Sequence, residues 1–478
     1  MSGNLAFTLP ELILSFGALV LLLVAGWRGD GATRGVGWAS VGLLTLAALS
    51  LLGPAGHGGV AFDGLYRADA FAAFAKLLIY IAAAVSIMIA PGWFARGGSL
   101  RAEYPILILL SSVGMGMMVS AGDLLTLYVG LELQSLAAYV LASFMRRDQR
   151  SAEAGLKYFI LGALASGILL YGIALLYGFT GTTLFDGIRD GIATRGLSTG
   201  LLFGLVFTLA GLAFKIAAVP FHMWTPDVYE GAPTPVTAFF ASAPKVAAMA
   251  LMVRVAVEAL GPATDAWRQI VIFSSLTSIV LGAVAAIGQT NIKRLLAYSS
   301  INNVGFALIG LAAGTPEGVS SVLIYMTVYI VMTLGSFVCV MRMRDLEGGQ
   351  VEEIAALSGL SRTRPALAAA LAMFMFSLAG IPPLFGFYPK FEVFRAATAA
   401  GLFWLAVAGA VGSVIGAYYY LKIVKTMYFD DPAPAFAPAP RNLEGGLIAV
   451  AAVAISPLGY LTIPLLAAAA MTAARGLF

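Results

Sequence analysis

Four ionisable side chains stand inside apolar stretches of the sequence, where proton transfer is the chemistry open to them: Glu132, Lys215, Lys245 and Lys390. Burial in a medium of low dielectric disfavours the charged form of a carboxyl or an ammonium, so such groups take up or release protons when a neighbouring charge changes. A lone carboxylate at membrane depth is costly, so Glu132 needs a partner, and Lys215 can provide it. We therefore treat these four residues as candidates for a catalytic proton relay.

Each of these residues also has a structural explanation. Lys215 could snorkel from a helix end to water, Glu132 could form a permanent ion pair, and Lys245 could have a purely structural role. Lys390 would be interfacial if its helix ends at the prolines that precede it. The relay is favoured because Lys215 has apolar neighbours on both sides, and because Pro244 frees backbone hydrogen-bonding groups next to Lys245.

Glu153, Lys157 and His222 are candidates for supporting roles. Lys157 follows Glu153 by four residues, the spacing of an ordinary ion pair on a helix surface. The sequence therefore favours neither a supporting role in proton transfer nor a plain surface ion pair. His222 could relay protons, since the unperturbed pKa of histidine is about 6.5, or it could hold a broken helix in place by hydrogen bonds. Other charged residues are expected to snorkel, to cap helices or to stabilise span ends: Lys76, Arg254, Asp123, Asp227 and Glu230.

The composition requires these residues to lie in a membrane. Of the 478 residues 60% are hydrophobic and 11% are charged, with a mean hydropathy of +0.92, whereas about 25% of residues are charged in ordinary soluble proteins. The net charge of +4 comes from residues scattered through short loops, which indicates topology rather than nucleic-acid binding. One cysteine, Cys339, and two histidines are too few for a disulfide, a cysteine-ligated cluster, a haem pair or a zinc site. We predict an all-α polytopic membrane protein.

Apolar runs of about 20 residues predict about fourteen transmembrane helices. They lie near residues 10–27, 36–53, 69–91, 104–121, 123–145, 152–178, 200–220, 235–260, 268–289, 295–314, 318–343, 365–387, 402–428 and 445–472. Most Lys and Arg residues of the loops follow odd-numbered helices, which predicts cytoplasmic odd loops and periplasmic termini. A short amphipathic helix is expected near residues 352–357, and an extended proline-rich linker over residues 430–441.

Prolines interrupt two of the predicted spans, at Pro220 in the seventh and at Pro382 and Pro383 in the twelfth. Irregular backbone at membrane depth requires surrounding protein or a watery cavity, and paired interrupted helices are typical of repeats in transporters. The breaks lie five spans apart, which predicts two inverted five-helix repeats, each with a broken helix. The expected division is a three-helix segment at 1–104, the repeats at 105–262 and 263–428, and a linker with the last span at 429–478.

The residues around the first break carry a resemblance to a known family. The run from Phe214 to Pro235, with Lys215 and the sequence Pro220-Phe221-His222, resembles the signature of the antiporter-like membrane subunits of respiratory complex I, the NADH–quinone oxidoreductase. The segments 130–133, 293–300 and 380–384 resemble the same family, with the sequences Gly-Leu-Glu-Leu, Lys-Arg-Leu-Leu-Ala-Tyr-Ser-Ser and Gly-Ile-Pro-Pro-Leu. The resemblance covers roughly residues 105–428, and the layout of spans extends it to the whole chain.

The resemblance implies a non-redox translocase subunit that couples quinone reduction elsewhere to proton pumping. Glu132 and Lys215 would be the charged pair of a first half-channel, Lys245 the central relay, and Lys390 the terminal lysine of the second half, while Lys157 with Glu153 would modulate the pair. NADH, FMN, iron–sulfur clusters and quinone would bind to other subunits, with no cofactor in this chain. The implied partners are membrane subunits of the A, J, K and M types and lipids, in a bacterial inner membrane.

Two other functions are compatible with the same charged residues. A subunit of a multi-subunit cation/proton antiporter would share the chemistry without electron transfer, and a structural scaffold would lock the charges in ion pairs. Co-purification with flavin and iron–sulfur subunits would select the oxidoreductase, whereas sodium-dependent antiport in their absence would select the antiporter.

Overall fold

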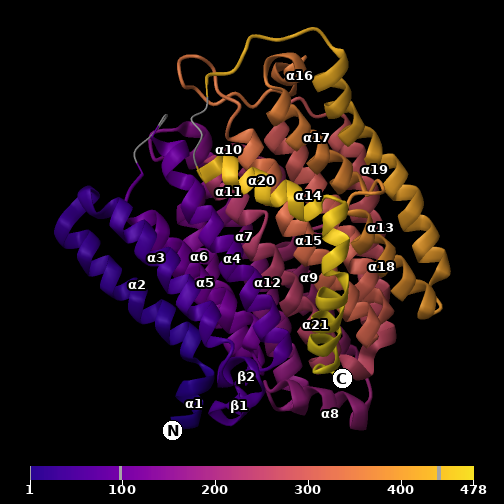
Figure 1. Cartoon of the computed structure of the whole chain (residues 1–478). Helices are drawn as coiled ribbons and strands as arrows, with labels where there is room; N and C mark the ends of the chain where they lie inside the picture. The colour runs from indigo at the N-terminus through magenta and orange to yellow at the C-terminus, as the bar shows by residue number, and fades with distance from the viewer. Residues whose placement is uncertain (1, 96–99, 439–442) are drawn as a thin grey trace.

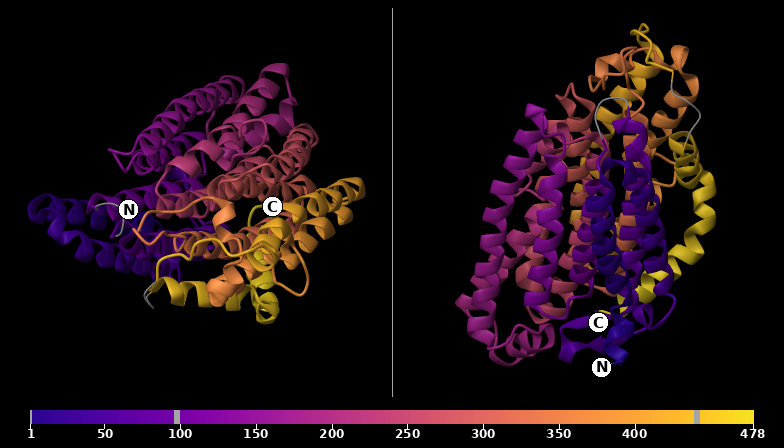
Figure 2. Two further views of the ribbon diagram at one scale, coloured as in Figure 1. Left: turned by 90° about the horizontal axis from the view of Figure 1, so that it is seen from above. Right: turned by 90° about the vertical axis from the view of Figure 1, so that its left-hand side faces the viewer.

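Long apolar helices make up most of the protein (Figure 1). The structure is a computed structural model that describes residues 2–95, 100–438 and 443–478. Among these residues, 12 segments are long and apolar enough to cross a membrane, and one of them, residues 9–50, contains two helices. Both termini lie at one end of the bundle, whereas residues 430–438 lie at the other end (Figure 1, Figure 2). The predicted all-α membrane class is confirmed.

The first part of the chain contains a β-hairpin between helices. Its elements are α1 (Ser2–Phe7), α2 (Leu9–Arg28), α3 (Thr33–Ser50), β1 (Gly59–Ala61), β2 (Tyr66–Ala68) and α4 (Ala70–Phe94). The strands pair antiparallel, with Val60 opposite Arg67. The side chain of Asp69 accepts a hydrogen bond from Ala72 N, because the first N–H groups of a helix lack partners within it. The hairpin was not predicted, since each strand has only 3 residues.

The middle of the chain carries the first three relay candidates. Its helices are α5 (Glu103–Ser120), α6 (Leu124–Ala142), α7 (Gln149–Thr180), α8 (Phe185–Arg195), α9 (Thr199–Ile216), α10 (Trp224–Gly231), α11 (Thr234–Phe240) and α12 (Ala243–Arg254). Asp123 caps α6 by accepting hydrogen bonds from Leu125 N and Thr126 N, in keeping with its predicted structural role. The short α8, which was not predicted, lies at the same end as the termini (Figure 1).

The last part of the chain carries Lys390. Its helices are α13 (Thr264–Ile287), α14 (Ile292–Ala313), α15 (Pro316–Val340), α16 (Leu360–Thr363), α17 (Pro365–Ala379), α18 (Phe387–Ala399), α19 (Phe403–Phe429), α20 (Leu443–Ile455) and α21 (Ile463–Arg475). The helix α14 and the span that contains α11 and α12 are central, since 94% of an 18-residue apolar stretch in each is buried, against 22% in the last span. The helices α2 and α3 lie on one side of the bundle and α19 lies on the other (Figure 1, Figure 2).

The two proline breaks have the same backbone arrangement. The helix α9 ends at Ile216, and Ala217 follows in the left-handed region with a φ of 60°. The helix α17 ends at Ala379, and Gly380 follows with a φ of 79°. In both, the next residue donates a hydrogen bond to a carbonyl five positions earlier, Ala218 to Ala213 and Ile381 to Phe376, as in a Schellman-type helix end.

Several predicted span boundaries were wrong. The seventh span, 200–220, ends at Ile216 and the twelfth, 365–387, at Ala379, because a proline disfavours helical backbone in the residue before it. The eighth, 235–260, is divided into α11 and α12 before Pro244, and the fourteenth, 445–472, into α20 and α21 by a 3₁₀ turn that starts at Pro457. The helix expected at 352–357 is a 3₁₀ turn over Ile354–Leu357. Residues 431–438 of the expected linker have no regular structure, and 439–441 lie outside the described residues.

Candidate functional site

Lys215 and Glu132 are linked through a serine hydroxyl. Lys215, in the last turn of α9, is only 7% exposed and donates a hydrogen bond to Ser135 Oγ at 2.6 Å. Glu132 precedes Ser135 by three residues on α6 and so lies on the same helix face. Its Oε1 is buried and has no hydrogen-bond partner among the described residues. Among the described residues Glu132 and Lys215 form no direct ion pair, and their charges interact at longer range.

Lys245 binds the end of the same broken helix. Lys245 is 1% exposed, and its Nζ donates a hydrogen bond to the carbonyl oxygen of Ile216 at 2.8 Å. Ile216 is the residue that follows Lys215 in the chain. This carbonyl belongs to the last turn of α9, where no following N–H group is available. The ring of Trp224 lies 5.8 Å from the ammonium and is itself fixed by a hydrogen bond from Nε1 to Phe214 O. The break in α9 therefore brings both lysines to one helix end.

Lys390 occupies a similar position at the second break. It lies on α18, not on the helix that precedes the prolines, and it is nonetheless buried at 5% exposure. Its Nζ donates to Ala379 O at 2.9 Å and to Ser413 Oγ at 3.0 Å, and it faces the ring of Phe306 at 4.6 Å. Lys390 therefore binds the last carbonyl of α17 as Lys245 binds the last carbonyl of α9.

Other buried cations have carboxylate partners. Lys76 contacts Glu11 at 2.6 Å, and Arg254 contacts both Asp69 and Glu258 at 2.8 Å. The prediction that Lys76 and Arg254 snorkel or cap was wrong, because both are 0% exposed and are neutralised inside the bundle. The spacing of Arg254 and Glu258, four residues apart on one helix, was a signal for the second pair.

The relay candidates differ from these ion pairs in one respect. Among the described residues, no carboxylate lies within ion-pair distance of Lys215, Lys245 or Lys390, and each donates only to neutral oxygens. An uncompensated ammonium in a low-dielectric interior is costly, so it releases its proton more readily than a paired one. These three lysines therefore differ from Lys76 and Arg254, whose charges carboxylates neutralise at close range.

Lys157 lies in a charge network at the end of the bundle opposite the termini. Its Nζ contacts Glu153 at 2.7 Å and Asp227 at 2.8 Å, and it makes no ion pair with Glu132. Burial acts to raise the pKa of Asp227, but hydrogen bonds from Lys157 and Arg294 outweigh it, so that the pKa lies below its ordinary value. We call this the α10 charge network and define it by its members: Arg150, Glu153, Lys157, Asp227, Glu230, Lys293, Arg294 and Glu352.

The α10 charge network connects α10, which follows the first break, to neighbouring parts of the chain. Arg294 contacts Asp227 at 2.7 Å and Glu230 at 2.9 Å, which joins the start of α14 to α10. Lys293 contacts Glu352 at 3.0 Å and so adds the loop before α16. The expectation that Asp227 and Glu230 are structural agrees with these contacts. His222 lies between α9 and α10 and is partly buried, and both interpretations of its role stay predictions.

A cluster of hydroxyl and amide groups, which the sequence did not predict, joins α14 to α15 and α19. Asn303 Nδ2 donates to Tyr420 OH at 3.2 Å, Tyr325 OH donates to Asn303 Oδ1 at 2.7 Å, and the Ser299 and Tyr420 hydroxyls are 2.5 Å apart. The polar run from Ser299 to Asn303 inside an apolar helix was the available signal. We call this the α14 hydroxyl cluster and define it by its members: Ser299, Ser300, Asn303, Tyr325, Tyr329 and Tyr420.

The described residues contain no group of three or more His, Cys, Asp or Glu side chains that could hold a metal ion. The three lysines donate hydrogen bonds to serine hydroxyls and backbone carbonyl oxygens, and of these groups the hydroxyl can both accept and donate a proton. The site thus consists of an acid, three lysines with neutral partners and two helix ends.

Comparison with known proteins finds similarity along the whole chain. Residues 121–416 match the family model described as "NADH:quinone oxidoreductase/Mrp antiporter, TM". A Rhizorhabdus wittichii protein described as NADH-quinone oxidoreductase subunit N is 73% identical over 480 residues, which cover 100% of both chains. A protein of the same description from Sphingopyxis alaskensis is 61% identical over 482 residues, again covering 100% of both.

Solved structures give the same result for the fold. A chain of respiratory complex I from Thermus thermophilus with bound aureothin superimposes with a TM-score of 0.81 at 34% identity, covering 95% of this chain and 98% of that one. A chain of the Mrp complex from Dietzia sp. DQ12-45-1b superimposes with a TM-score of 0.86 at 23% identity, covering 99% and 98%. The second likeness shows a shared fold.

Proposed function

The chain belongs to the NADH:quinone oxidoreductase/Mrp antiporter transmembrane family, and we propose that it acts as subunit N, a proton-translocating membrane subunit of a bacterial NADH–quinone oxidoreductase. The identity of 73% over the full length of a protein with that description supports this function. The chain would be part of the translocase without a redox centre of its own. NADH, FMN, iron–sulfur clusters and quinone would bind to other subunits of the complex.

We also propose a position in the complex, which the family resemblance implies. Subunits of the A, J and K types would lie on one side and the M type on the other, in the bacterial inner membrane. The arginine- and lysine-rich loops at the end opposite the termini would face the cytoplasm, because cytoplasmic loops of membrane proteins carry the excess of basic residues. Both termini would then be periplasmic.

The observation that carries the relay proposal is the neutral environment of the three buried lysines. A proton that arrives at Glu132 would pass by way of Ser135 to Lys215, whose Nζ lies 2.6 Å from that hydroxyl. Lys245 follows, since it binds the carbonyl of the residue next to Lys215. Quinone reduction elsewhere in the complex would change the electrostatic potential at Glu132 and so shift the protonation of each lysine in turn.

The step from Lys245 to Lys390 would use the α14 hydroxyl cluster. The helices α14 and α15 contact α10 and α11 near the first break and also α18, which carries Lys390. Hydroxyl groups that are both donors and acceptors can pass a proton along a hydrogen-bonded chain, and the hydroxyls of Ser299 and Tyr420 are joined in this way. This cluster would serve the second half, where Lys390 donates only to neutral oxygens and has no carboxylate within ion-pair distance among the described residues.

Two features support the proposal that the chain contains two inverted repeats. The breaks after α9 and α17 have the same hydrogen-bond pattern. The helix pairs α5–α6 and α13–α14 also pack alike, because Gly114 leaves no room for a Cβ against the backbone of Gln134, and Gly282 leaves none against the backbone of Asn302. The segments 105–262 and 263–428 would then be the two copies, between the N-terminal segment 1–104 and the last part 429–478.

The relay is tested in the assembled complex in proteoliposomes. Glu132→Gln and Lys215→Ala should each remove most of the proton pumping and slow NADH–quinone turnover, while the complex keeps its size and subunit content. Lys422→Ala serves as the matched control, because Lys422 is an exposed lysine on α19 that lies outside the relay. Full pumping by Lys215→Ala would remove that residue from the relay.

The family also includes subunits of cation/proton antiporters, and the purified assembly separates the two functions. Flavin and iron–sulfur subunits should co-purify with this chain in stoichiometric amounts. Sodium-dependent antiport by an assembly without those subunits would contradict the proposed function and support the antiporter.

A further inference from the structure

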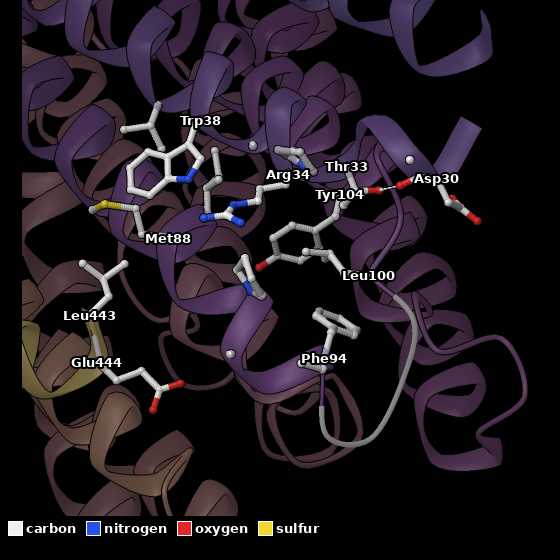
Figure 3. A pocket seen from close by; sticks show the side chains of 18 residues that line it. Asp30, Thr33, Arg34, Trp38, Met88, Phe94, Leu100, Tyr104, Leu443 and Glu444 are labelled. Atoms are coloured by element: carbon white, nitrogen blue, oxygen red, sulfur yellow. Dashed lines mark hydrogen bonds between the residues drawn. The ribbon is translucent and has the colours of Figure 1, made fainter. Parts of the chain in front are cut away.

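A cavity of about 610 Å³ lies away from the relay (Figure 3). The helix ends around it are at the end of the bundle opposite the termini (Figure 1). It is bounded by the start of α3, the end of α4, the start of α5 and the start of α20. Its volume is in the range of small-molecule sites, which are mostly apolar with a few placed polar groups. None of the relay candidates lines it.

The wall of the cavity is apolar and continues into the outer surface of the bundle. Trp38 and Val41 of α3 face Ile87 and Met88 of α4, with Leu443 at the start of α20. Trp38 is 56% exposed, and tryptophan is typical of the boundary between lipid tails and headgroups. The outer faces of α2 and α3 carry many exposed leucines, as expected of helices in contact with lipid. The cavity therefore opens at the level of the membrane interface.

Three charged residues line the cavity: Asp30, Arg34 and Glu444. The carboxylate of Asp30 points away from Arg34 (Figure 3), so Arg34 and Glu444 are the two opposite charges on the cavity. Arg34 makes no hydrogen bond or ion pair with any residue in the described ranges, and Figure 3 shows its guanidinium between Trp38 and the hydroxyl of Tyr104. Glu444 lies across the cavity at 5% exposure. Its Oε2 is 3.5 Å from Arg342 Nε, beyond the usual length of a charged hydrogen bond, so its capacity to accept hydrogen bonds is only partly used.

The carboxylate of Glu444 is held at this place by its neighbours. Its Oε1 lies against Gly92 of α4, which has no side chain to displace it from this position. A buried carboxylate with unused acceptor capacity favours a ligand that brings hydrogen-bond donors and a positive charge. Arg34 favours a phosphate, which a guanidinium binds with two parallel hydrogen bonds. One ligand that satisfies both is zwitterionic.

We propose that this cavity binds a phospholipid of the inner leaflet whose headgroup combines a phosphate with a primary ammonium, that is, a phosphatidylethanolamine. Its phosphate binds Arg34, its ammonium donates hydrogen bonds to Glu444, and an acyl chain lies along Val41, Ile87 and Met88. A choline headgroup does not fit in the same way, because a quaternary ammonium has no N–H to donate. The site is independent of the proposed relay.

The test uses the assembled complex in nanodiscs that contain a small fraction of phospholipid with a photoreactive acyl chain. Illumination and peptide mapping then measure the labelling of the peptides that contain Val41 and Ile87. We expect several-fold more labelling by the ethanolamine probe than by a choline probe with the same chains. Glu444→Gln should lower ethanolamine labelling to the choline level, and Arg34→Gln should lower the labelling by both probes.

Arg28→Gln is the matched control, because Arg28 is an exposed arginine in the last turn of α2 that does not line the cavity. Its labelling should equal that of the unsubstituted protein, and NADH–quinone turnover of every variant reports correct assembly. Equal labelling by the two probes in the unsubstituted protein would overturn the proposal. So would stronger labelling by an anionic phosphatidylglycerol probe, which would indicate a simple anion site, or the absence of labelling, which would indicate that another subunit covers the cavity.

Discussion

Lys76 and Lys245 are both buried lysines, and the structure predicts different effects of replacing each by methionine: a loss of stability for Lys76 and a loss of pumping for Lys245. Lys76→Met leaves the Glu11 carboxylate buried with only the Tyr66 hydroxyl as a donor. Breaking a buried ion pair by removing one partner costs about 3–5 kcal/mol. Lys245→Met removes a buried charge and leaves one neutral carbonyl, that of Ile216, without its hydrogen bond, which costs about 1–3 kcal/mol. The removal of an uncompensated charge offsets most of that cost.

Thermal unfolding of the assembled complex and proton pumping in proteoliposomes check this prediction together. Lys76→Met should lower the midpoint temperature and the yield of complex, and the double substitution with Glu11→Gln should restore much of both, because no charge is then left unpaired. Lys245→Met should keep the yield and midpoint temperature but lose pumping. The reasoning fails if Lys245→Met destabilises the complex as strongly as Lys76→Met, or if it pumps normally.

Three other substitutions follow from the same contacts. Lys215→Arg should impair pumping, because a guanidinium stays protonated, and normal pumping would indicate a fixed charge. Burial acts to raise the pKa of Glu352, but Lys293 outweighs it and holds the pKa below its ordinary value. The contact between Lys293 and Glu352 therefore contributes its full stabilisation of the folded chain above about pH 4.3. This stabilisation is lost as the pH falls through the lowered pKa of Glu352. The protection of backbone amides around Glu352 from hydrogen exchange, relative to the intrinsic rate at each pH, should persist to about pH 4 and be weak at every pH in Glu352→Gln. Tyr420→Phe removes the hydroxyl next to Ser299 and should slow pumping, whereas Tyr418→Phe, on the exposed side of α19, should not.

The helix breaks were predictable because their cause is local. Pro220 and the pair at Pro382 cannot donate a backbone hydrogen bond, and they disfavour helical backbone just before them. The exact ends of the helices were less predictable. Gly380 signals a left-handed residue after α17, but Ala217 adopts the same conformation without such a signal. The surrounding core, where Ala217 is 0% exposed, holds it there against its local preference.

The partners of the buried charges were not predictable from local sequence. Lys76 and Lys245 both lie in spans rich in alanine and leucine, yet one meets a carboxylate from α2 and the other a carbonyl from α9. These contacts join helices that are far apart in the chain, so no spacing within a span records them. The sequence identified which residues are buried and ionisable, and only the packing of the helices separates an ion pair from a candidate proton carrier.

The breaks also explain how a lysine can be buried without an acid and still bind a proton. The carbonyls of Ile216 and Ala379 are free because the helices end there, and a helix C-terminus carries a partial negative charge. Such an end stabilises a cation by about 0.3–1 kcal/mol, and by up to about 2 kcal/mol in a partly buried geometry. A buried carboxylate would hold the proton far more strongly, since removing one partner of such a pair costs about 3–5 kcal/mol. A helix end at each break therefore lets Lys245 and Lys390 bind a proton weakly enough to pass it on, which a continuous helix, with its carbonyls already bonded, would not allow.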